Sequence, residues 1–162
     1  MLTYSTRDLP AKAKVSYWND AVSSVFTPLE ARPFDYSAFD ADISCLNLGR
    51  IALAHVVSGA ASIVHQVSHA SRSTERKFFI QLHVRGRFAV SQDGKEVELE
   101  EGDFTFCDTS LPFTIHLGEA TTTLVLSVPA AELKQYLPTP EQAICTKLSG
   151  KQGFSSVTST ML

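Results

Sequence analysis

The chain has 162 residues, of which 44% are hydrophobic and 19% are charged. This composition excludes a disordered or low-complexity chain and is sufficient for one domain with its own core. Fourteen Lys and Arg residues against seventeen Asp and Glu residues give a net charge of −3. The chain therefore lacks the overall positive field that would attract nucleic acid to it.

The cysteines and the N-terminus indicate the cellular compartment. Cys45, Cys107 and Cys145 are widely spaced and form no CxxC pair, which is typical of reduced thiols rather than a disulfide framework. The N-terminal residues contain no apolar signal core, and no apolar run has the length of a membrane span. We therefore expect a cytoplasmic protein that does not associate with a membrane.

Residues 10–26 have the pattern of an amphipathic helix. Its apolar side chains recur at spacings of three and four residues: Val15, Trp18, Val22, Val25 and Phe26. Pro10 suits the start of a helix, and Pro28 and Pro33 lead the chain into a different element. We expect residues 1–33 to form an N-terminal helical arm.

From residue 34 to residue 129 short β-rich runs alternate with turn residues. We expect strands near 36–47, 50–57, 61–69, 77–85, 87–92, 95–100, 103–107, 112–117 and 121–128. Asp93-Gly94 lies between two alternating runs and predicts a hairpin with a type I′ turn. Many short strands at regular intervals predict an antiparallel sandwich or barrel.

Residues 130–162 return to helical patterns. AAELKQYL is a short amphipathic segment, and TPEQAICTKL has Pro140 at the first position of a second helix. A third apolar stripe then predicts an amphipathic helix that docks on its own barrel or on a second copy of the chain: Phe154, Val157, Met161 and Leu162. Because a free Met-Leu end is unusual, we interpret the sequence as a fragment of a longer polypeptide.

The residue pattern does not favour catalysis. No HxH pair accompanies a carboxylate, and His65 and His69 lie four residues apart on an expected strand. There is no GxSxG motif and no paired Cys-His motif at a helix start. We expect no catalytic residue, no metal and no cofactor. A metal-dependent cupin enzyme remains the alternative, and a metal analysis of the protein tests it.

The run KFFIQLHVRG is the most informative strand. One face is apolar, formed by Phe78, Ile80, Leu82 and Val84. The other face combines aromatic and polar side chains, formed by Phe79, Gln81, His83 and Arg85. Such a strand is typical of a sheet with one packed side and one side that faces ligand or solvent.

Arg72 and Arg76 form an RxxxR pattern within an arginine-rich stretch. The pattern resembles the arginine motif of PilZ-type cyclic-dinucleotide receptors, in which guanidinium groups hold phosphate and stack on guanine. It is also common by chance, and solvated loop charges are the favoured interpretation. A cyclic dinucleotide is therefore an alternative ligand.

Three stretches together resemble the N-terminal sensor domain of AraC/XylS-family transcription regulators, of the AraC-binding-like type. They are YWNDAVSSVFTPLEARP, FFIQLHVRGRFAVSQDGKEVELEEGDFTFCDTSLPFTI and TTTLVLSVPAAEL, which in order and spacing cover most of residues 14–135. The resemblance implies a cupin-like double-stranded β-helix barrel over residues 34–129. It also implies a helical dimerisation segment over residues 130–162, truncated here, and a C-terminal helix-turn-helix domain that this chain lacks.

The resemblance further implies an effector pocket inside the barrel. Arg72 would point toward its mouth, and Trp18 would cover the opening or pack outside. The wall residues carried over from the family pattern are Phe79, Gln81, His83, Ile115, Leu117, Thr122 and Leu124. Because this wall is largely aliphatic with one aromatic ring, it suits an aromatic or amphipathic effector better than a sugar.

The function implied is that of a ligand-sensing, homodimeric domain that controls DNA binding by the missing C-terminal domain. Ligand would favour one domain or dimer arrangement over another. A packed barrel that only dimerises is a further alternative, and it predicts no change in melting temperature with any ligand.

Overall fold

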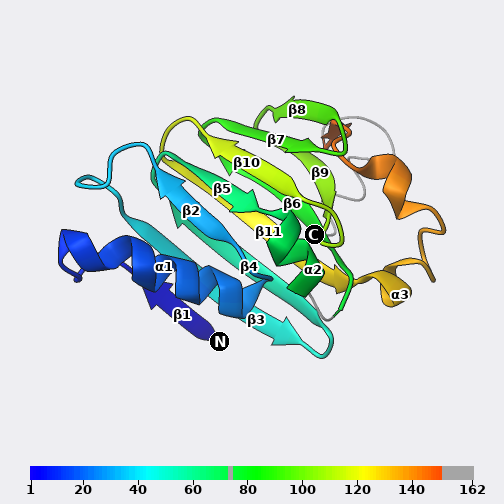
Figure 1. Ribbon diagram of the computed structural model, residues 1–162. Coiled ribbons are helices and arrows are strands. Elements are labelled where there is room, and N and C mark those ends of the chain that lie inside the picture. The colour runs from blue at the N-terminus through cyan, green and yellow to red at the C-terminus, as the bar shows by residue number, and fades with distance from the viewer. Residues whose placement is uncertain (73–74, 151–162) are drawn as a thin grey trace.

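The computed structural model of the chain describes residues 1–72 and 75–150 (Figure 1). Within these residues the fold is mainly β and consists of two sheets. In spatial order the larger sheet contains β1 (Leu2–Ser5), β3 (Ala41–Leu48), β4 (Ile51–Ser58), β11 (Thr121–Pro129), β6 (Lys77–Arg85), β9 (Asp103–Asp108) and β12 (Leu148–Ser149). The smaller sheet contains β2 (Glu30–Pro33), β5 (Ala61–His65), β10 (Phe113–Leu117), β7 (Phe88–Gln92) and β8 (Lys95–Leu99).

The strand order is that of a cupin-like double-stranded β-helix, as the sequence predicts. From β5 onward the chain alternates between the sheets: β6, β9 and β11 enter the larger sheet, and β7, β8 and β10 enter the smaller one. Neighbouring strands pair in antiparallel register throughout both sheets of the described part. The inner faces of the two sheets therefore meet and enclose the core.

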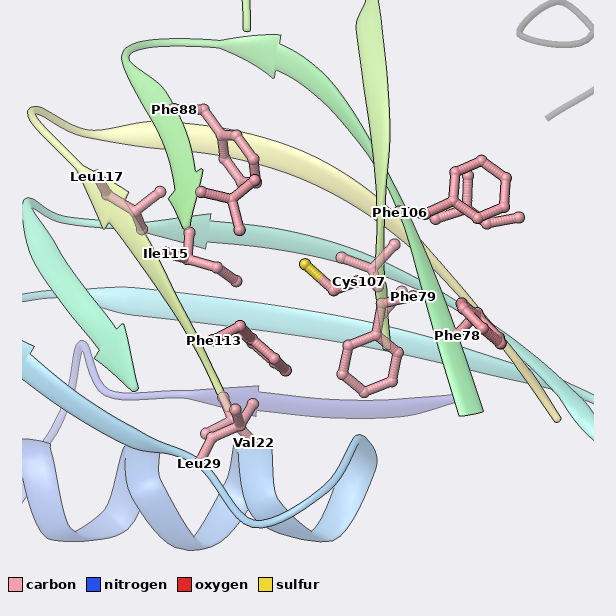
Figure 2. Close-up of a cluster of buried hydrophobic side chains, with 14 of the residues drawn as sticks. Val22, Leu29, Phe78, Phe79, Phe88, Phe106, Cys107, Phe113, Ile115 and Leu117 are labelled. Carbon is pink, nitrogen blue, oxygen red and sulfur yellow. The ribbon is translucent and has the colours of Figure 1, made fainter. Parts of the chain in front are cut away.

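The core combines aromatic and aliphatic side chains from both sheets. In Figure 2, Phe79 and Cys107 lie opposite Phe113 and Ile115, and α1 passes close by. Phe78 and Phe106 project from the other face of β6 and β9. This division follows the period-two alternation of KFFIQLHVRG that the sequence shows.

Helix α1 (Ala11–Val25) confirms the helix predicted over residues 10–26. The predicted apolar stripe faces the core, with Trp18 and Val22 buried and Val15, Val25 and Phe26 packed against the core at its margin. Pro10 occupies the N-cap position. The helix packs against β2 and also contacts β1 (Figure 1).

The predicted hairpin turn is also confirmed. β7 and β8 pair with Gln92 opposite Lys95, which leaves Asp93 and Gly94 as the two turn residues. Their φ angles are 55° and 73°, as a type I′ turn requires at both central positions.

The N-terminal segment is more than the helical arm expected for residues 1–33. β1 pairs with β3 and β2 pairs with β5, so this segment adds a strand to each sheet. Both strands are only four residues long. Strands this short carry too little alternation to be recognised from sequence.

The strand expected over residues 61–69 is wrong in its second half. β5 ends at His65, and α2 (Val67–Arg72) follows. The ring nitrogens of His65 lie 2.8 Å from the carbonyl oxygens of Pro28 and Thr109, which hold the strand end. The backbone N–H of Gln66 donates to Nδ1 of His69 at 2.9 Å, and this bond supports the helical turn.

The helices expected after Pro129 are shorter than the sequence predicts. AAELKQYL forms α3 over Ala130–Leu133, and TPEQAICTKL forms only the 3₁₀ turn η1 (Pro140–Ala143) before β12. Cys145 N–H donates to the carbonyl oxygen of Phe106 at 3.1 Å, and β12 pairs with β9. Backbone pairing with the open edge of β9 therefore outweighs the local helical preference.

Candidate ligand-binding cavity

A cavity of about 70 Å³ lies between the two sheets and is covered by helix α1. Among the described residues no charged side chain lines it. The wall contains Trp18, Val22, Phe26, Leu29, Val56, Ser58, Ile63, Phe79, Gln81, Phe88, Phe113, Ile115, Leu117, Thr123 and Val125. A cavity that holds a single water molecule needs a volume of roughly 10–15 Å³, so this cavity is larger than an ordinary packing defect.

Helix α1 turns its apolar face to the cavity and is attached to the smaller sheet by a polar contact. Trp18 and Val22 of α1 face the cavity, and Phe26 and Leu29 follow the helix (Figure 2 shows Val22 and Leu29). Oδ1 of Asn19 accepts a hydrogen bond from Ala31 N–H at 2.7 Å. These contacts anchor the helix to β2 of the smaller sheet.

Four of the sequence-predicted wall residues line the cavity, Phe79, Gln81, Ile115 and Leu117, and Trp18 lines it from the covering helix. Their contact with a ligand stays a prediction. The wall is more aromatic than expected, because Phe26, Phe88 and Phe113 join Trp18 and Phe79. Phe113 and Phe88 begin the strands β10 and β7, and alternation with Ile115 and Leu117 signals the inward position of Phe113.

Thr122 and Leu124 do not line the cavity, and Thr123 and Val125 do so in their place. The pairing of β11 with β6 changes register between Thr122 and Thr123, where Arg85 and His83 are the successive partners. The extra residue of this irregularity, Val84, lies on β6, whereas alternation along β11 is unbroken, with Thr121, Thr123 and Val125 buried. The predicted positions therefore lie on the outer face of β11.

His83 lies on the inner face of the larger sheet but is not part of the cavity wall. Its Nε2 donates to the carbonyl oxygen of Gly86 at 2.7 Å, and its ring stacks on Phe88 with 5.7 Å between the centroids. Its Nδ1 is buried and has no hydrogen-bond partner among the described residues. A buried nitrogen of this kind is unusual, because nearly all buried polar atoms are paired.

Gln81 is the central polar group of the wall. It is 3% exposed, and its Oε1 accepts from the Cys107 thiol at 3.5 Å. Burial raises the pKa of the Cys107 thiol well above its ordinary value, so the sulfur keeps its proton and acts as the donor. Thr105 is the partner of Gln81 across β6 and β9, and its buried hydroxyl has no partner in the described part of the chain.

Arg76 is not available to the cavity. Its guanidinium forms an ion pair with Asp108 at 2.7 Å and another with Glu141 at 3.0 Å. It also lies over the ring of Phe78, 5.0 Å from the centroid. A role for Arg76 in binding phosphate would require these ion pairs to break.

The remaining predicted site residues lie outside what the structure describes. Arg72 is the last residue of α2, and the position of its side chain is not described. The stripe predicted for dimerisation also lies outside the described residues: Phe154, Val157, Met161 and Leu162.

Two further features bear on possible activities. Across residues 1–72 and 75–150, no three His, Cys, Asp or Glu side chains gather in a way that would hold a metal ion. In the same ranges no helix has the length and apolar character needed to cross a membrane.

The profile of the AraC-binding-like domain matches residues 18–162. The chain belongs to this family. A protein from Bacillus sp. (strain OxB-1), described as an uncharacterized protein in the nit 5′ region, is 27% identical over 128 residues, covering 79% of this chain and 50% of that protein.

One solved structure is similar in fold over most of the chain. The crystal structure of the AraC-like transcriptional activator CuxR matches with a TM-score of 0.78 and 20% identity, covering 93% of this chain and 55% of CuxR. The cupin domain of Schizosaccharomyces pombe Cnp3 matches with a TM-score of 0.46 and 10% identity, covering 59% of this chain and 69% of that one. The chain therefore spans about half the length of the Bacillus protein and of CuxR.

Proposed function

We propose that this AraC-binding-like domain is a cytoplasmic, non-catalytic sensor whose barrel binds a small effector and controls DNA binding by another part of the same regulator. The observation that carries the proposal is the uncharged cavity between the sheets, covered by a single helix. Family membership supports a regulatory role. A ligand that displaces α1 changes the free energy of one conformation relative to another, which is the basis of allosteric control.

The aromatic wall supports an aromatic or amphipathic effector rather than a sugar. Sugars need many hydrogen-bonding side chains, whereas the polar side chains of this wall are Ser58, Gln81 and Thr123. Ser58 already donates to the carbonyl oxygen of Gly59 at 3.0 Å. Few polar groups therefore remain for a ligand.

Thermal melting of the 162-residue chain with a library of small aromatic compounds tests the proposal. A ligand that binds only the folded state raises the melting temperature, and the stabilisation grows with the logarithm of the ratio of ligand concentration to dissociation constant. Val125→Phe fills the cavity and is expected to abolish the rise, and Thr123→Leu fills it with less added volume. Leu124→Phe, on the outer face of the same strand, is the control and is expected to keep the rise.

A rise that survives both filling variants places the ligand elsewhere and overturns the barrel site. If no compound in the library changes the melting temperature, and native mass spectrometry of the purified protein detects no bound small molecule, the packed dimerisation module replaces the sensor proposal.

We also propose that residues 130–162 mediate homodimerisation through the stripe formed by Phe154, Val157, Met161 and Leu162. The apolar spacing over one helical face supports this assignment. Sedimentation analysis of Val157→Asp tests it, with Ser156→Asp as the control at the adjacent position. We expect the first variant to be monomeric and the second to remain dimeric. If the Val157→Asp variant remains dimeric, the stripe is not part of the dimer interface.

A further inference from the structure

We propose that the cavity binds an uncharged aromatic molecule with one hydrogen-bond-accepting head group, held by Gln81 with support from Thr123. This assignment rests on the proposed sensor function and specifies the class of its effector.

The cavity is asymmetric. On the inner face of the larger sheet, Thr123 of β11 is the partner of His83, and Gln81 of β6 is the partner of Thr105. These four side chains form a continuous polar patch. The facing wall is apolar, with Phe113, Ile115 and Leu117 from β10 and Phe88 from β7. A ligand that matches both walls has one polar end and an apolar body.

Gln81 supplies a directed donor within the patch. Its Oε1 is engaged by the Cys107 thiol, whereas its Nε2 has no hydrogen-bond partner among the described residues. Gln81 is 3% exposed and lines the cavity, so its amide N–H₂ is a hydrogen-bond donor within the cavity wall. A carbonyl or hydroxyl oxygen of a ligand would accept from it.

The groups behind Gln81 reinforce the same chemistry. Thr105 Oγ1 and His83 Nδ1 are buried and unpartnered in the described part of the chain. The hydroxyl of Thr105 can both donate and accept a hydrogen bond. The patch thus contains both donors and acceptors, which suits a head group such as a carboxamide that can offer both.

The absence of charged side chains among the described lining residues sets the charge of the ligand. Arg76, the arginine that directly precedes β6, is committed to Asp108 and Glu141. An anion in the cavity would lose its hydration without gaining a cationic partner. The ligand is therefore neutral.

The size and lining of the cavity favour an aromatic body that moves the covering helix. Phe79 packs edge to face against both Phe26 and Phe113, with centroid distances of 5.5 Å and 6.3 Å. An aromatic ring extends this set of contacts. A cavity that admits benzene has a volume of about 150 Å³, so a ring enters this smaller space by displacing side chains of α1. The same displacement would signal occupancy.

Three probes with the same number of non-hydrogen atoms test the assignment by calorimetric titration of the 162-residue chain. They are benzamide, which is neutral and polar, benzoate, which is anionic, and isopropylbenzene, which has no polar head. We expect benzamide to bind about tenfold or more tightly than either of the others, because isopropylbenzene makes no hydrogen bond and benzoate loses the hydration of its charge without a cationic partner.

Three variants locate the head group. Gln81→Leu is expected to weaken benzamide binding about tenfold while leaving isopropylbenzene unchanged or tighter. Thr123→Val is expected to weaken benzamide by a smaller factor. Thr122→Val, which alters the outer face of the same strand, is expected to change neither affinity, and melting curves establish that each variant is folded.

The outcomes separate this assignment from the sensor function. Equal affinity for benzamide and isopropylbenzene overturns the polar anchor, and tighter binding of benzoate overturns the neutral class and assigns a charge to His83. In both cases a probe still binds in the cavity, so the proposed sensor function stands. If none of the three probes binds, the ligand class is wrong, and the library and native mass spectrometry measurements decide separately whether the barrel binds any effector.

Discussion

Arg76 and Asp108 form an ion pair across β6 and β9, with 2.7 Å between Nη2 and Oδ2. Asp108 is 2% exposed and also accepts hydrogen bonds from the backbone N–H and the hydroxyl of Ser110. Glu141 binds the same arginine at 3.0 Å and Lys134 at 3.1 Å. This network connects the end of the barrel to the segment that follows it.

Loss of Arg76 is expected to destabilise the fold strongly. Arg76→Gln leaves the buried Asp108 carboxylate without its cationic partner, which costs about 2–4 kcal/mol in the free energy of unfolding. Arg50→Gln is the matched control, because its ion pair with Glu75 is exposed and contributes less than about 1 kcal/mol. Urea denaturation measures both. Equal losses would show that the Arg76 pair behaves as a surface contact.

The same pair makes stability depend on pH. Burial by itself would raise the pKa of Asp108, but the hydrogen bond from Arg76 and those from Ser110 outweigh it and hold the pKa below its ordinary value. A lowered folded-state pKa contributes stability that is complete above the unfolded pKa, near 3.9, and is lost as the pH falls through the folded value. The stability advantage of the wild type over Asp108→Asn should therefore shrink between about pH 5 and pH 3. An advantage that stays constant over this interval would contradict the ionised pair.

Removal of the ring at the centre of the covering helix tests its role in the core. Trp18 is 1% exposed, and Trp18→Ala is expected to cost about 3–5 kcal/mol in the free energy of unfolding and to enlarge the cavity. Tyr17→Ala alters the adjacent, exposed ring and should cost less than about 1.5 kcal/mol. Chemical denaturation compares the two variants. A small effect of Trp18→Ala would mean that the barrel is stable without this cover.

Gly86 is expected to tolerate no side chain. Its φ is +94°, and a Cβ there would overlap the carbonyl oxygen of Ala120 and come within 2.9 Å of Thr121 Cα. Gly94 has a φ of +73° but no neighbour within 4 Å. Gly94→Ala should cost about 1–2 kcal/mol from backbone conformation alone, and Gly86→Ala about 1–3 kcal/mol more. Thermal unfolding of both variants measures the difference, and equal costs would exclude the steric contribution.

The strands of this barrel can be predicted from the sequence because side chains along each strand alternate between two faces with a period of two residues. The alternation of 77–85 correctly separates Phe79 and Gln81 from Phe78 and Ile80, and Asp93-Gly94 correctly marks the hairpin turn. The apolar stripe of α1 likewise indicates its buried face. These are local properties, and the chain within a few residues determines them.

Other features depend on partners that are distant in sequence. The inward set on β11 is Thr123 and Val125 rather than Thr122 and Leu124, because the pairing of β11 between β4 and β6 selects one of two faces of similar composition. The role of Arg76 depends on Asp108, which is 32 residues away. The segment after Pro140 pairs with β9 instead of continuing as a helix.

The sequence by itself therefore determined the type of most elements, the two faces of the central strand and, through its family resemblance, the cupin-like barrel. Only the tertiary structure decided which face of β11 lines the cavity, which arginine is already neutralised, and that Gln81, Thr123, His83 and Thr105 form one polar patch. The physical reason is that hydrophobic periodicity specifies which residues avoid water, whereas register and long-range pairing specify which of them meet.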